Sequence, residues 1–203
     1  MAAQLKVIAF PDDDENIGGN DLDTARKAVK KAAPGAGYTF IEGYSETGDL
    51  IAQLKDILKA NPQKCLTTLE IVAHSNPEIC NGLEPLTIGG FGKSFMKLRL
   101  CDNVEIYLSG CNTGLVPPRA VLSSNRQAVA KQLVDTMPYN ASTFPVHVTV
   151  YGTLGYMLQG TSGMQGNPQV QRSYRHGGVD YPIYPGSKDA NGNANAYQAF
   201  KNW

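Results

Sequence analysis

Two short segments of this 203-residue chain carry side chains that suit acyl transfer. His74 comes directly after the apolar run TTLEIVA, and Cys111 lies within the sequence VEIYLSGCNTG. A cysteine attacks a carbonyl carbon as the thiolate, so it needs a nearby base, and an imidazole can take that proton and later protonate the leaving amine. We therefore expect Cys111 to act as a nucleophile and His74 as its acid/base partner.

The neighbours of this pair suit the binding of a tetrahedral oxyanion. Backbone N–H groups stabilise such an anion when they point at the developing charge, and we expect those of Ser75 and Cys111 to do so. Gly110 and Gly114 flank the cysteine. Because glycine lacks a Cβ, we expect them to let the chain turn sharply and to leave room for an acyl group.

The elements that must position these residues alternate between strand and helix. The expected strands cover residues 5–10, 38–42, 67–73, 104–109 and 146–152. The expected helices cover residues 21–33, 47–60, 89–100 and 124–137. This alternation predicts an α/β fold with a mostly parallel central sheet and helices on both faces. His74 and Cys111 each follow a strand, and the carboxyl edge of such a sheet is where ligands bind.

The length of the chain predicts one domain, residues 1–203. Residues 1–152 carry the α/β pattern, whereas residues 153–203 are rich in Gly, Asn, Pro, Tyr and Ser. A long loop segment at the carboxyl edge of a sheet commonly shapes a substrate cleft, so we expect residues 153–203 to form a cleft wall or lid.

Charge and hydropathy argue against several classes of partner. Eighteen basic residues balance eighteen acidic ones, so no basic field favours nucleic acid. No apolar run is long enough to span a membrane, and the amino terminus lacks the features of a signal peptide. We expect no membrane partner, and a location in the cytoplasm or export without a recognisable signal peptide.

The other cysteines do not predict a metal site or a cofactor. Four cysteines occur without a CxxC pair, and their spacing fits no zinc pattern. Paired disulfides are possible, but a chain of this size has its own core and does not need them, and an intracellular origin would keep the thiols reduced. We expect Cys65, Cys80 and Cys101 to be structural thiols outside the catalytic pair.

The segments LEIVAHSNP and VEIYLSGCNTGL resemble the His-bearing and Cys-bearing strand ends of the caspase-like superfamily, clan CD. SGCNTG is similar to the Ser-Ala-Cys-Asn-Thr-Gly motif of CHAT-domain peptidases, relatives of separase, and YGTLGYM looks like their next strand. The resemblance covers about residues 5–157 in element order. It implies a three-layer caspase-like sandwich and a His74/Cys111 dyad that cleaves a protein or peptide through a thioester. These families usually have His-Gly where this chain has His74-Ser75.

The acidic residues near the first strand suggest a substrate preference. Asp12, Asp13 and Asp14 follow that strand, which lies beside the His strand in caspase-like sheets. A cationic P1 side chain, Arg or Lys, would find a carboxylate there, with Asp180 as the alternative partner. The same acidic run is compatible with a solvated loop or with calcium activation.

Two other functions use the same residues. A degenerate caspase-like module would bind a protein through the cleft without turnover, in keeping with Ser75. A deamidase or transamidase would keep the dyad and act on a glutamine side chain. A flavodoxin-like nucleotide binder is disfavoured, because PDDDEN follows the first strand in place of a Gly-rich phosphate loop.

Overall fold

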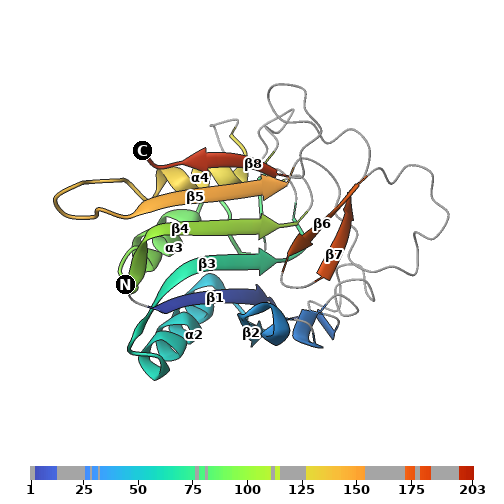
Figure 1. Ribbon diagram of the computed structural model, residues 1–203. Helices are drawn as coiled ribbons and strands as arrows, with labels where there is room; N and C mark the ends of the chain where they lie inside the picture. Colours follow the sequence, from blue (N-terminus) through green and yellow to red (C-terminus); the bar gives the residue numbers. More distant parts are fainter. Residues whose placement is uncertain are drawn as a thin grey trace.

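A six-stranded sheet organises the protein, as Figure 1 shows. The computed structural model describes residues 3–12, 26–27, 29–31, 33–75, 78–80, 82–110, 113–114, 127–153, 172–176, 179–183 and 197–203. The strand order is β2-β1-β3-β4-β5-β8. These strands are β1 (Ala3–Phe10), β2 (Tyr38–Glu42), β3 (Lys64–Val72), β4 (Leu100–Ser109), β5 (His147–Thr153) and β8 (Tyr197–Lys201).

The first five strands are parallel to their neighbours, whereas β8 runs antiparallel to β5. Parallel strands need crossover connections, and the intervening segments supply them. The expected α/β fold with a mostly parallel sheet is confirmed.

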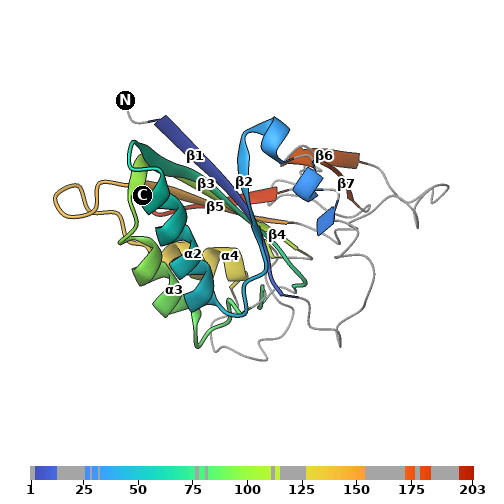
Figure 2. The same ribbon diagram turned by 90° about the horizontal axis from the view of Figure 1, so that it is seen from below.

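Helices α2 (Thr47–Ala60), α3 (Ile88–Phe95) and α4 (Val129–Asp135) gather on one side of the sheet in Figure 2. Apolar residues of α2 recur at helical spacing and are buried: Leu50, Ile51, Leu54 and Leu58. They join one core with alternate residues of the strands, such as Val7, Leu69 and Ile106. Among the described residues, no helix has the length and hydropathy needed to cross a bilayer.

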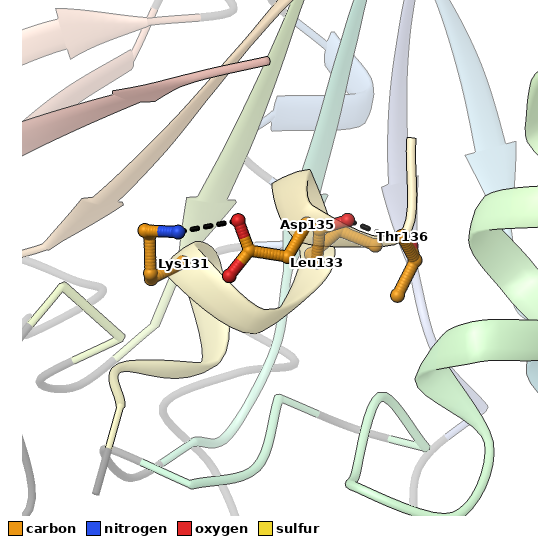
Figure 3. Close-up of polar contacts among 4 residues, drawn as sticks. All are labelled: Lys131, Leu133, Asp135 and Thr136. Atoms are coloured by element: carbon orange, nitrogen blue, oxygen red, sulfur yellow. Dashed lines mark hydrogen bonds and ion pairs between the residues drawn. The ribbon is translucent and has the colours of Figure 1, made fainter. Parts of the chain in front are cut away.

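A close approach between α3 and α4 depends on a glycine. A Cβ on Gly92 would lie only 2.8 Å from the Cβ of Thr136. The Thr136 hydroxyl donates to the carbonyl oxygen of Leu133 at 2.7 Å, and Lys131 pairs with Asp135 one turn apart (Figure 3). A small residue in α3 therefore lets the capped end of α4 pack against it.

The opposite face of the sheet is covered differently. Residues 26, 27 and 29–31 are helical, and the short helix η1 (Pro34–Ala36) follows them. Val29 and Ala33 pack against Ile8, Phe10 and Val72 to form a second, smaller apolar cluster. With the three helices on the other side, this arrangement is compatible with a three-layer α/β sandwich.

The described residues after residue 152 include three further strands. β8 lies at the edge of the sheet, and β6 (Arg172–His176) pairs with β7 (Val179–Ile183) as a separate two-stranded sheet. The sequence carries no strong alternation here, so these strands were not expected. The final residues of the chain therefore contribute to the central sheet.

A disulfide joins Cys65 to Cys101 near the amino-terminal ends of β3 and β4. The two Cα atoms are 5.1 Å apart, a spacing that a disulfide bridges without backbone movement. The expectation of unbridged thiols at these positions is wrong, because parallel pairing brings two residues that lie 36 positions apart onto neighbouring strands. Cys80 is buried and lies outside this disulfide.

We expect removal of this disulfide to destabilise the protein. Closing a loop of 36 residues restricts the unfolded chain, which corresponds to about 3–4 kcal/mol of stability. The double variant Cys65→Ser/Cys101→Ser should unfold at lower urea concentration, followed by the fluorescence of Trp203, the single tryptophan. Dithiothreitol should shift the wild type similarly and leave the double variant unchanged. Identical midpoints for the oxidised wild type and the double variant would contradict the prediction.

Candidate active site at the carboxyl edge of β3 and β4

The pairing of β3 with β4 brings the ends of these strands together. The register runs to Val72 opposite Ser109, and the Ala73 N–H donates to the Ser109 carbonyl oxygen at 3.3 Å. His74 is the second residue after β3 and is exposed to solvent. Cys111 is the second residue after Ser109 and lies outside the described residues. The strand end that carries His74 therefore adjoins the strand end that leads to Cys111.

The loops after the two strands touch at Gly110. A Cβ on Gly110 would overlap the Ser75 hydroxyl and would lie 2.5 Å from the Ala73 carbonyl oxygen. Gly110 does not have a positive φ. Its lack of a side chain lets the turn after β4 pack against the loop that contains His74 and Ser75.

The far side of this turn is fixed by two buried threonines. The Thr113 hydroxyl donates to the Leu108 carbonyl oxygen at 2.8 Å, and the Thr153 N–H donates to the Thr113 hydroxyl oxygen at 2.8 Å. The Thr153 hydroxyl bonds to the Gly110 carbonyl oxygen, while the Gly114 N–H donates to the Thr153 carbonyl oxygen at 2.8 Å. Residues 111 and 112 thus separate two anchored points, Gly110 and Thr113.

Gly114 and Gly152 bring two backbones into direct contact. A Cβ on Gly152 would lie 2.6 Å from the Cα of Gly114, and one on Gly114 would overlap the Gly152 carbonyl group. We expected Gly110 and Gly114 to serve a sharp turn and substrate approach. In the structure they serve contacts with the loop after β3 and with the end of β5.

The loop after His74 folds back on itself. Isolated bridges join Ser75 to Cys80 and Cys80 to Leu83, and backbone hydrogen bonds of 3.0 Å run both ways between Cys80 and Leu83. Glu78 is 6% exposed in this loop. The loop that would supply the Ser75 N–H to an oxyanion therefore has its own backbone framework, and the role of that N–H stays a prediction.

The acidic residues expected to bind a basic side chain lie at separate places. Asp12 is exposed after β1, its N–H donates to the Tyr44 carbonyl oxygen at 3.0 Å, and its carboxylate occupies the space beside Gly43. It therefore turns toward β2, the neighbour of β1 on the side away from β3. Asp180 lies in β7, opposite Arg175. Asp13 and Asp14 lie outside the described residues, so the predicted substrate preference stays a prediction.

A buried carboxyl group next to this edge was not expected from the sequence. Glu70 is fully buried in β3, and the Ser109 hydroxyl donates to its Oε1 at 2.6 Å. Burial raises the pKa of Glu70 to about 8, opposed by the hydrogen bond from Ser109. The signal in the sequence is a single carboxylate inside the apolar run TTLEIVA, where a solvated position is not available.

A metal-dependent site finds no support in the part of the chain that the structure describes. No three His, Cys, Asp or Glu side chains gather there in a way that would hold an ion. The alternative of calcium activation involved residues 12–15. Of these, residues 13–15 lie outside the described residues.

No protein-family model matches the sequence, and comparison with the curated proteins gives no match. The resemblance to caspase-like peptidases therefore rests on the two strand-end segments themselves.

We expect Gly114→Ala to destabilise the site through a backbone collision that side-chain movement cannot relieve. Overpacking of this kind costs about 1–3 kcal/mol. Urea unfolding of this variant should be compared with Gly89→Ala, a matched control on α3, where an added Cβ meets nothing within 4 Å. Because alanine favours a helix, the control should keep or gain stability. Equal stability of the two variants would contradict the close approach.

We expect Glu70 to make stability depend on pH. The folded state holds this proton up to about pH 8, whereas the unfolded chain releases it near 4.5. The folded state therefore binds more protons in this window, and the free energy of unfolding falls by about 1.4 kcal/mol per pH unit as pH rises. Between pH 5.5 and 7.5 the wild type should lose about 2–3 kcal/mol relative to Glu70→Gln. Parallel pH dependences in urea titrations of the two proteins would rule this out.

Proposed function

We propose that the protein is a cysteine peptidase with a caspase-like fold, formed by a single domain and using His74 and Cys111. The observation that carries the proposal is the meeting of two strand ends: β3 leads to an exposed His74, and β4 leads through Gly110 to Cys111. The sequence motif and the pairing of β3 with β4 both support this proposal. Catalytic groups commonly lie at this edge of parallel sheets.

The chemistry follows from the two groups. His74 takes the thiol proton, and the Cys111 thiolate attacks the carbonyl carbon of the scissile peptide bond. The tetrahedral oxyanion collapses when the C–N bond breaks, and His74 gives its proton to the leaving amine. A water molecule then attacks the thioester, His74 accepts a proton from that water, and the carboxylic acid leaves as the thiol is restored.

Fixed loop anchors support this chemistry. Gly110 contacts Ser75 and Ala73 on one side, while Thr113 bonds to Leu108 and Thr153 on the other. Short spans between anchored points lose little entropy when a substrate binds, which favours a productive geometry. A basic P1 preference, from Asp12 to Asp14 or Asp180, belongs to the same proposal.

We expect cleavage of a peptide library to require both dyad residues. Cys111→Ala should abolish turnover, and His74→Ala should lower it by about 10²–10⁴-fold, the usual contribution of a general acid/base. The matched histidine control is His147→Ala, since His147 begins β5 at the opposite edge of the sheet. Mass spectrometry of the products should show shortened peptides with Arg or Lys at P1.

Three outcomes would overturn parts of this proposal. Identical cleavage by wild type and Cys111→Ala would exclude Cys111 as the nucleophile. Binding of peptides without any turnover would favour a non-catalytic module. Products that keep their length but change mass at glutamine would assign the dyad to a deamidase or transamidase.

A further inference from the structure

Ser109 is the last residue of β4, and it contacts β3 two positions before Cys111. Its hydroxyl donates to Glu70 on β3 at 2.6 Å, and its carbonyl oxygen accepts from the N–H of Ala73 at 3.3 Å. The next residue, Gly110, packs against Ser75. Three successive contacts therefore fasten the end of β4 to the end of β3.

The position of Glu70 allows it to hold the end of β4 against β3. It lies opposite Tyr107, two residues before Ser109, in the continuous β3–β4 ladder. Glu70 and Ser109 are both fully buried. A buried polar group that loses its hydrogen-bond partner costs free energy. Loss of the Glu70 acceptor would therefore make the Ser109 hydroxyl bond elsewhere, and this would shift the end of β4.

We propose that Glu70 is a positioning residue for the dyad, which acts through Ser109 to hold the turn before Cys111 against the loop that carries His74. This inference rests on the proposed function, because it assigns a role within the same site. Glu70 itself does not need to touch substrate.

Ionisation of Glu70 would change the electrostatics near the turn after β4. Burial raises its pKa to about 8, so the group is mainly neutral at pH 7. Cys111 is two residues beyond Ser109, and two residues of chain span at most about 7 Å. A carboxylate formed above pH 8 would therefore oppose the formation of a thiolate at Cys111.

Other charged groups lie on the elements around Glu70. These groups are Lys6 on β1, Tyr38 on β2, His74 after β3, Glu105 and Tyr107 on β4, Tyr151 on β5, and Arg26, Lys27, Lys30 and Lys31 among the helical residues on this side.

The test measures the rate at which a peptidyl acyloxymethyl ketone labels Cys111 between pH 6 and 9.5, read by mass spectrometry of the labelled peptide. For the wild type we expect the rate to fall at least threefold above pH 8. Glu70→Gln keeps an oxygen that accepts from Ser109 and cannot ionise, so it should lose this alkaline fall. Glu70→Leu removes the acceptor and should label at least tenfold more slowly at pH 7.

The matched control is Glu105→Gln, which changes a carboxylate on the next strand and should keep the wild-type pH profile. Trp203 fluorescence verifies that each variant is folded. An alkaline fall in Glu70→Gln equal to that of the wild type overturns this inference while the dyad stands. Labelling of Cys111 that does not depend on His74 overturns the proposed function, and this inference with it.

Discussion

The parallel pairing of β3 with β4 determines where the described residues of the candidate site lie. A slip of one residue would reverse the faces of a strand and would separate Gly110 from Ser75. Burial on both faces opposes such a slip, because Leu69 and Ile71 face the helices while Glu70 and Val72 are buried on the other side. The Cys65–Cys101 disulfide fixes the opposite ends of the same strands. The position of His74 is thus set by contacts along the whole strand.

Different kinds of side chain cover the two faces of the sheet. The face under α2, α3 and α4 is apolar, whereas the other face carries carboxyl and phenol groups. Tyr107 and Tyr151 stack with ring centroids 4.5 Å apart, and both hydroxyls donate to Glu105, at 3.0 and 3.3 Å. Burial and the charge of Glu105 raise the pKa of both tyrosines, so they stay neutral donors. Such a network orders its part of the face, beside the smaller apolar cluster of Ile8, Phe10 and Val72.

The sequence predicts well those helices and strands that are marked by apolar spacing and by residues that end them. The helix at Thr47–Ala60 and the strand at Tyr38–Glu42 match their predicted bounds, because apolar spacing and Asn61-Pro62 mark them clearly. β4 begins four residues earlier than predicted, since Cys101, Asp102 and Asn103 lack strand-like hydropathy. The position of His74 at the carboxyl edge of the sheet was predicted from the order of strands and helices along the sequence. The disulfide, β8 and the Glu70–Ser109 pair depend on neighbours that only the folded chain brings together.

Gly110, Thr113 and Gly114 flank positions 111 and 112, and their packing explains why small residues occur there. Backbones that approach as closely as Gly114 and Gly152 leave no space for water, so the polar groups around them need partners within the protein. Threonine supplies both a donor and an acceptor at little volume, and Thr113 and Thr153 use both. Close backbone packing therefore requires small residues. The backbone polar groups buried by this packing require hydroxyl groups as hydrogen-bond partners. The same two requirements also fix Gly110 and Thr113, so the described residues on either side of positions 111 and 112 are held by packing among the ends of β3, β4 and β5.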